Sequence, residues 1–212
     1  MTKAVQPPPA ANRSRILFGG AVAFILAAGL TAILLSRGSN NDTAAATETA
    51  PITVTGTALP PFPDDPAATD PARGMTFPVL AGNAPDGSAM SLPTTGRRTL
   101  VVAVAHWCPH CQREVPRLVQ WASSGAVPAD LDVVFLSTAI DQNAPNYPPS
   151  AWFTKESVPF PILVDDEKSS GHQALGGMGF PNLHLVGADG NVIARASGEL
   201  EIDALQLFAA QT

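Results

Sequence analysis

Two cysteines separated by two residues are the part of this sequence best suited to do chemistry. The segment His106-Trp107-Cys108-Pro109-His110-Cys111 contains both cysteines of the 212-residue chain. An apolar, β-branched run at 99–105 precedes it, and a stretch with helical character follows at about 109–124. The pair is therefore predicted to lie where a buried strand gives way to a helix, a position that makes the C-x-x-C match specific. Such a pair can cycle between a dithiol and a disulfide.

The start of the predicted helix should activate one of the two sulfurs. If Cys108 is the N-cap residue, Pro109 occupies the first helical position, where its missing N–H has no cost, and Cys111 is the third. The unpaired N–H groups of the first turn and the positive end of the helix dipole then favour a Cys108 thiolate. Cys108 is predicted to be the attacking sulfur, with Cys111 close enough on the same face to form a disulfide.

The histidines are given different roles. His110 lies within one turn of both sulfurs, and its imidazole is predicted to stabilise the Cys108 thiolate and make the couple more oxidising. The alternative is a partly exposed histidine at the helix end with no partner. His106 is expected to pack around the motif together with Trp107, while His172 and His184 are interpreted as an ordinary loop histidine and strand histidine.

The elements around the motif alternate between strands and helices. A hairpin, a strand–helix–strand unit, a second helix with a third strand, another hairpin and a final helix are predicted in that order. Their ranges are 77–80 and 88–92, then 99–105, 109–124 and 131–137, then 150–157 and 161–164, then 182–187 and 191–196, then the C-terminal helix at 199–210. This order is that of thioredoxin. The predicted fold is an α/β thioredoxin-like domain with a central mixed sheet flanked by helices, spanning residues 75–212.

Residues 16–35 are predicted to be a transmembrane anchor. They contain no charge over 20 positions, and a helix of that length spans roughly 30 Å of hydrocarbon. Because Lys3, Arg13 and Arg15 precede this run, the positive-inside rule places residues 1–15 in the cytoplasm and the rest of the chain outside. A cleaved secretory signal is the alternative, although its apolar region is usually about 7 to 15 residues long.

The segment 36–74 is interpreted as a disordered tether. It is rich in Ala, Thr, Pro and Asp, so it offers little apolar surface to offset the entropy of ordering. A short strand at 52–55 is the one element it could contain.

Composition excludes several other classes of protein. The net charge is -6 and no Lys/Arg cluster occurs, which argues against nucleic acid as a partner. Two cysteines are too few for a multi-bridge disulfide framework or a four-cysteine zinc site. Disulfide exchange needs neither a cofactor nor a metal, and none is predicted.

Further motifs resemble the TlpA/ResA-like branch of the membrane-anchored thioredoxin-fold disulfide oxidoreductases. The matching residues are Trp107 to Cys111, Glu114, Pro116, the run 160–167, Gly179-Phe180-Pro181 and residues 189–192. The resemblance implies that Pro181 is a cis-proline facing the disulfide, and that Phe180, Pro181, Trp107 and Pro109 contact the substrate. It also implies that Glu114 assists proton movement and that Pro116 kinks the helix.

Two departures bear on mechanism and direction. Ordinary thioredoxins carry a buried aspartate in the strand before the motif, whereas residues 100–105 contain no ionisable group, so Glu114 is the candidate proton acceptor. A carboxylate near sulfur could equally raise the thiol pKa and oppose His110. The Pro109-His110 dipeptide resembles that of strongly oxidising enzymes of the DsbA type, which leaves the direction of exchange open.

The sequence thus predicts an extracytoplasmic thiol:disulfide oxidoreductase, anchored in the lipid bilayer. Its expected partners are exported proteins with thiols or disulfides, in cytochrome c maturation or oxidative folding, and a membrane redox protein. A membrane-tethered copper chaperone that uses Cys108, Cys111 and a histidine is the alternative. Peroxide reduction fits less well, because Ala105 stands where the peroxidatic cysteine of that related fold usually has a threonine, three residues before it.

Overall fold

The computed structural model describes residues 46–65, 68–177 and 179–212. The predicted cytoplasmic segment 1–15 and the predicted anchor 16–35 lie outside these residues. In the part that is described, none of the helices combines the length and apolarity needed to cross a bilayer.

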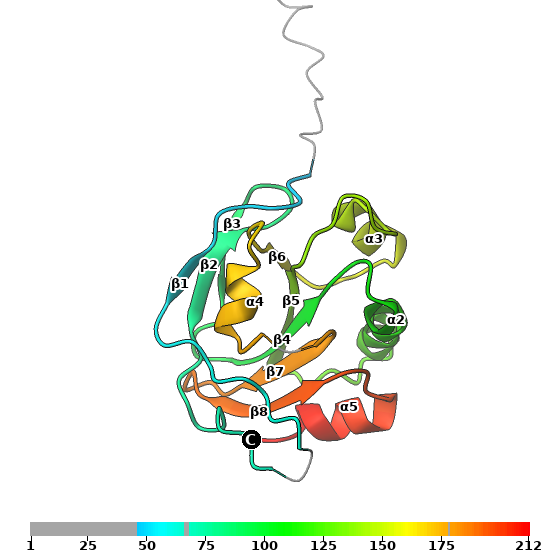
Figure 1. The fold of residues 1–212 in the computed structure, drawn as a ribbon. Coiled ribbons are helices and arrows are strands. Elements are labelled where there is room, and N and C mark those ends of the chain that lie inside the picture. Colours follow the sequence, from blue (N-terminus) through cyan, green and yellow to red (C-terminus); the bar gives the residue numbers. More distant parts are fainter. Residues whose placement is uncertain (1–45, 66–67, 178) are drawn as a thin grey trace, which may run out of the picture. The chain divides into compact units, whose positions relative to one another are not determined.

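A five-stranded mixed sheet forms the centre of the domain, as the sequence predicted (Figure 1). Three neighbouring strands are parallel, and the last two are antiparallel to their neighbours. In spatial order they are β6 (Ile162–Val164), β5 (Leu131–Ser137), β4 (Arg98–Val104), β7 (Asn182–Val186) and β8 (Val192–Ser197). The motif Cys108–Cys111 follows β4, the central strand, which pairs with β5 on one side and β7 on the other.

Helices cover one face of this sheet and a second, smaller sheet covers the other. Along β4, Leu100, Val102 and Val104 pack with helices α2 (Pro109–Ser123), α3 (Pro149–Lys155) and α5 (Ile202–Ala209). Val101 and Ala103 alternate with them and face a second core. That core is closed by α4 (Ser170–Ala174) and the antiparallel sheet of β1 (Thr53–Thr55), β2 (Val79–Asn83) and β3 (Ala89–Leu92). Burial on both faces explains why β4 reads as a continuous apolar run.

Helix α4 is an element that the sequence did not predict. The buried carboxylate of Asp165 accepts hydrogen bonds from the backbone N–H groups of Gly171 (2.8 Å) and His172 (3.0 Å) and from the Thr138 hydroxyl (2.7 Å). These bonds satisfy amides of the first turn, which have no partner within a helix. This five-residue helix is therefore held by the Asp165 side chain, which lies six and seven residues before the amides it binds, and not by its own periodicity.

The prediction of a disordered tether up to residue 74 is wrong for the described residues from 46 onward. The possible strand at 52–55 is present as β1, which pairs with β2. Leu59 and Ala72 are buried in the core, and the Leu59 amide donates to the Ala174 carbonyl at 2.8 Å. Ala50, Leu59 and Ala72 of this segment are buried in the domain, which average composition does not show.

Arg195 of β8 binds residues of the segment before residue 74. Its side chain is fully buried and its Nε donates to Asp70 Oδ2 at 2.9 Å. Nη1 donates to the Pro60 carbonyl at 3.0 Å, and the guanidinium lies 5.5 Å from the centre of the Phe62 ring. One buried cation therefore holds three separate points of the chain between residues 60 and 70.

Replacing Arg195 with methionine is expected to destabilise the protein by about 3–5 kcal/mol, because it leaves the half-buried Asp70 carboxylate without its counter-ion. Arg97→Met is the matched control, since Arg97 pairs with Asp132 at 2.9 Å but the two side chains are 46% and 30% exposed, and pairs near the surface contribute about 0–1 kcal/mol. Chemical unfolding of the full-length chain in detergent measures both. Equal destabilisation by the two variants would contradict the role given to Arg195.

Candidate redox site

The motif lies at the junction of strand and helix that the sequence predicted. Cys108 is the N-cap of α2, with φ -73° and ψ 121°, and Pro109 stands in the first turn. The Cys108 carbonyl accepts the Gln112 N–H at 3.1 Å, the first bond of the helix. Pro116 lies inside the helix, as the resemblance implied.

The two sulfurs differ in their access to solvent. Both are free thiols; Cys108 is 6% exposed and Cys111 is fully buried. Burial raises the pKa of the Cys111 thiol far above its usual range, and the nearby Cys108 and Glu114 add to the shift against an opposing backbone bond at Ala105. Cys111 is therefore held protonated and inside, while Cys108 is the outer sulfur.

A loop from the other side of the sheet completes the surroundings of Cys108. The Cys108 thiol donates to the Phe180 carbonyl at 3.5 Å, and the peptide between Phe180 and Pro181 is cis, as the resemblance implied. The Phe180 ring meets Trp107 edge to face, with centroids 6.1 Å apart. Trp107 is 37% exposed and donates from Nε1 to the Ala139 carbonyl at 2.7 Å. Three of the four predicted substrate contacts, Trp107, Phe180 and Pro181, thus meet around the outer sulfur, and Pro109 follows it directly.

His106 packs beneath the motif, as predicted. The Asp141 N–H donates to its Nε2 at 3.2 Å, so Nδ1 carries the hydrogen and donates to the Pro145 carbonyl at 2.8 Å. The Asn146 side-chain amide also donates to the His106 carbonyl. A buried neutral histidine therefore anchors the loop that follows β5 next to the cysteines.

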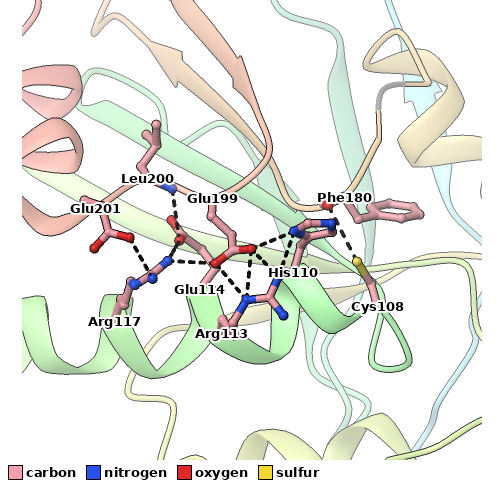
Figure 2. A network of polar contacts seen from close by, with 9 residues as sticks. All are labelled: Cys108, His110, Arg113, Glu114, Arg117, Phe180, Glu199, Leu200 and Glu201. Atoms are coloured by element: carbon pink, nitrogen blue, oxygen red, sulfur yellow. Dashed lines mark hydrogen bonds and ion pairs between the residues drawn. The ribbon is translucent and has the colours of Figure 1, made fainter.

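His110 does not take the partner that the sequence predicted. Its Nδ1 lies 2.6 Å from Glu199 Oε1, and its side chain is 60% exposed. Among the contacts of the described residues, none joins the imidazole to a sulfur; the ring meets Glu199 and Arg113 (Figure 2). The alternative of a histidine without a partner is wrong. Glu199 reaches it from the loop between β8 and α5, which no local pattern reveals.

Glu114 is a buried acid behind Cys111. Its side chain is fully buried, its Oε2 accepts the Leu200 N–H at 3.1 Å, and Arg117 Nη1 lies 3.6 Å away. Oε1 has no hydrogen-bond partner among the described residues. Burial raises the pKa of this carboxyl to about 7, although the Leu200 amide and Arg117 oppose the shift. A group with that pKa can accept or donate a proton near neutral pH.

Arg113, Arg117 and Glu199 are site residues that sequence reasoning missed. Arg117 bonds Glu199 at 2.9 Å and Glu201 at 2.8 Å, while Arg113 Nε lies 3.0 Å from both oxygens of Glu199. Hydrogen bonds from Arg113 and then His110 lower the pKa of Glu199 to about 2. The two arginines could have been found, because they continue the helical stripe of His110 at intervals of three and four residues.

The remaining histidines belong to the core. His184 lies on β7, as predicted, and bonds Asn182 Oδ1 at 2.8 Å. His172, predicted in a loop, lies instead in α4, with Nε2 3.0 Å from the Asn182 amide nitrogen. Burial, with smaller contributions from Arg195 and His172, lowers the pKa of His184 to about 3. The buried His184 ring is therefore neutral near neutral pH.

The structure shows no donor set for the copper alternative. Across residues 46–65, 68–177 and 179–212, no three His, Cys, Asp or Glu side chains gather as metal ligands would. The histidine nearest to the cysteines in sequence points to Glu199 instead.

A mixed sheet with a C-x-x-C motif at the start of its first long helix, opposite a cis-proline loop, defines the thioredoxin-like class of folds. Within this class the chain belongs to the Redoxin family, whose model matches residues 66–206. No curated protein sequence matches the chain.

Solved structures agree with this class. StoA from Bacillus subtilis is 18% identical with a TM-score of 0.53, and the match covers 65% of this chain and 98% of StoA. A secreted Mycobacterium tuberculosis disulfide oxidoreductase homologous to E. coli DsbE is 19% identical with a TM-score of 0.52, over 61% and 93% of the two chains. A putative thiol:disulfide interchange protein DsbE from Chlorobium tepidum is 22% identical with a TM-score of 0.52, over 65% and 96%. At these identities the likeness establishes the fold.

Proposed function

We propose that the protein is a thiol:disulfide oxidoreductase that works through the Cys108–Cys111 couple. The observation that carries this proposal is the asymmetry of the pair. Cys108 caps the helix beside the cis-Pro181 loop, while Cys111 lies fully buried one turn further, next to a carboxyl whose pKa is about 7. The Redoxin family and the thiol:disulfide oxidoreductases among its structural neighbours support the same chemistry.

In the reducing direction, the Cys108 thiolate attacks one sulfur of a substrate disulfide. The substrate S–S bond breaks, its second sulfur leaves as a thiolate and takes up a proton, and a mixed disulfide joins Cys108 to the substrate. The Cys111 thiol then loses its proton and attacks the Cys108 sulfur, which releases the second substrate thiolate. Two electrons pass to the substrate, and Cys108 and Cys111 form a disulfide. The oxidising direction is the reverse of these steps.

Glu114 is the group that takes the Cys111 proton. Cys111 cannot attack while it is protonated, and its burial disfavours a free thiolate. The Glu114 carboxylate is close enough to influence the charge of Cys111, and its Oε1 is free to accept. Because the Cys111 thiol passes its proton to the Glu114 carboxylate, no free proton has to cross the core.

We further propose that residues 16–35 anchor the protein in the bilayer and that the domain acts outside the cytoplasm on exported proteins. The uncharged run and the basic residues before it support this location. Such a location separates the couple from cytosolic reductants, so a membrane redox partner must supply or remove electrons. Reduction of thiols before haem attachment to cytochrome c and oxidative folding are the two candidate processes. Alkaline extraction of membranes and protease accessibility of the domain test the location.

Equilibration of the full-length chain, purified in detergent, with glutathione redox buffers tests the function. We expect a single two-electron transition in which both cysteines become protected from alkylation together. A potential near -270 mV, about that of thioredoxin, indicates a reductant, and one near -120 mV, about that of DsbA, indicates an oxidant. A chain that does not exchange with glutathione but retains one copper ion after dialysis against a chelator would contradict the proposal.

A further inference from the structure

We propose that Glu199 is a positioning residue that shifts the Cys108–Cys111 couple toward reducing potentials, because it neutralises the cationic groups beside Cys108. This inference rests on the proposed function and concerns its direction. It is carried by three contacts that one carboxylate makes along the first three turns of α2 (Figure 2).

The carboxylate of Glu199 lies across the stripe formed by His110, Arg113 and Arg117. Oε1 is 2.6 Å from His110 Nδ1 and 2.6 Å from Arg113 Nη2, and Oε2 is 2.9 Å from Arg117 Nη1. Arg113 Nε also lies 3.0 Å from both oxygens. Only 18% of the Glu199 side chain is exposed, so solvent screens these contacts less than it screens an open surface pair.

The contact with His110 fixes where the imidazole hydrogen lies. A carboxylate oxygen can only accept a hydrogen bond, so His110 Nδ1 must carry a hydrogen that points to Glu199. Arg113 Nη2, 3.0 Å from the same nitrogen, then donates to Glu199 and not to the ring. The sequence predicted that an imidazole N–H would stabilise the Cys108 thiolate. The Nδ1–H of His110 instead donates to the Glu199 carboxylate.

Arg113 is the cation that interacts electrostatically with Cys108, the outer sulfur. Hydrogen bonding to Glu199 raises the pKa of its guanidinium, and the charge of Cys108 adds a smaller contribution in the same direction. A positive charge that interacts with the Cys108 thiolate stabilises it, which favours the reduced dithiol and makes a couple more oxidising. Because the Glu199 carboxylate binds this guanidinium, it offsets that effect.

Two substitutions that break the same ion pair test the proposal, because they change charge in opposite directions. In Glu199→Gln the amide keeps the volume of the side chain while Arg113 loses its counter-ion. The equilibrium constant for reduction of the Cys108–Cys111 disulfide by glutathione should rise about tenfold, equivalent to a potential higher by about 30 mV. In Arg113→Gln the carboxylate remains without that cation, and the potential should move the opposite way. If the role were structural only, both variants would lose the same contact and shift the potential in the same direction.

Two further measurements complete the test. The pH midpoint of Cys108 alkylation should fall in Glu199→Gln and rise in Arg113→Gln, in step with the potentials. Glu201→Gln is the matched control, because Glu201 pairs with Arg117 at 2.8 Å but its side chain is 79% exposed. The equilibrium constant of this variant with glutathione should stay within twofold of the wild-type value. Shifts of the same sign, no shift, or an equal shift in Glu201→Gln would overturn the role of Glu199 while wild-type exchange upholds the proposed function. A wild-type chain without exchange would overturn both.

Discussion

Replacing Cys108 with serine is expected to lower the rate of exchange with glutathione disulfide by on the order of a thousandfold or more, because the attacking thiolate is lost. Serine is nearly isosteric with cysteine and is among the preferred N-cap residues, so α2 should keep its start at Pro109. Stopped-flow measurement of the exchange rate in the full-length chain gives the effect.

The interpretation of that experiment depends on a folded variant. Cys108 makes no side-chain cap bond to the helix, so its replacement removes no helix-stabilising contact, and the unfolding midpoint should match that of wild type. A Cys108→Ser protein that keeps more than about a tenth of the wild-type rate would contradict the assignment of the nucleophile.

Glu114→Gln is expected to slow the second step, attack by Cys111 on the mixed disulfide, by about a hundredfold or more, the range for loss of a general base. Wild type can use Glu114 only as a carboxylate, and burial raises its pKa to about 7. The rate of this step should therefore increase as pH rises through about 7, and this increase should be missing in the variant. Rapid quenching of the mixed disulfide over a pH series measures both.

Glu114→Gln should also change how the free energy of unfolding depends on pH. The folded pKa of Glu114, about 7, lies above the ordinary value of 4.5, so the folded state holds the proton more tightly than the unfolded chain does. This contribution is fully present below pH 4.5 and is lost as pH rises through about 7, with a slope of up to about 1.4 kcal/mol per pH unit. Glu114→Gln should remove this slope and Glu201→Gln should keep it. An unchanged pH profile of both rate and stability in Glu114→Gln would contradict its role.

Much of the fold could be predicted from local patterns. The continuous apolar run that became β4 is buried on both faces, and Cys108 takes the cap position that Pro109 indicated. These features depend on neighbours in sequence, which is why periodicity and capping rules find them. The cis peptide before Pro181 is different, because only the family resemblance implied it.

The errors share a physical cause, since each depends on a particular side-chain contact that composition and periodicity do not show. Residues from 46 onward fold into the domain because Leu59 reaches the core and Arg195 binds Asp70, 125 residues away. Helix α4 exists because Asp165 satisfies its first amides. Composition and propensity average over neighbours and do not include such partners.

His110 shows the same effect at the site itself. From its spacing it was predicted to stabilise the Cys108 thiolate, and it lies on the expected face of the helix. Glu199, 89 residues away, accepts its hydrogen bond and changes what the ring contributes. A dipeptide between two cysteines is thus an incomplete guide to redox direction, because the loop that packs against it also sets its charge.

In this mechanism Cys108 attacks the substrate disulfide and Cys111 resolves the mixed disulfide. Incubation of the full-length Cys111→Ser and Cys108→Ser variants with glutathione disulfide, followed by intact mass and peptide mapping, tests it most directly. We expect one glutathione per chain on Cys108 in the first variant and none in the second, because the buried Cys111 is neither ionised nor accessible. Glutathione on Cys111 in the second variant, or none on Cys108 in the first, would contradict it.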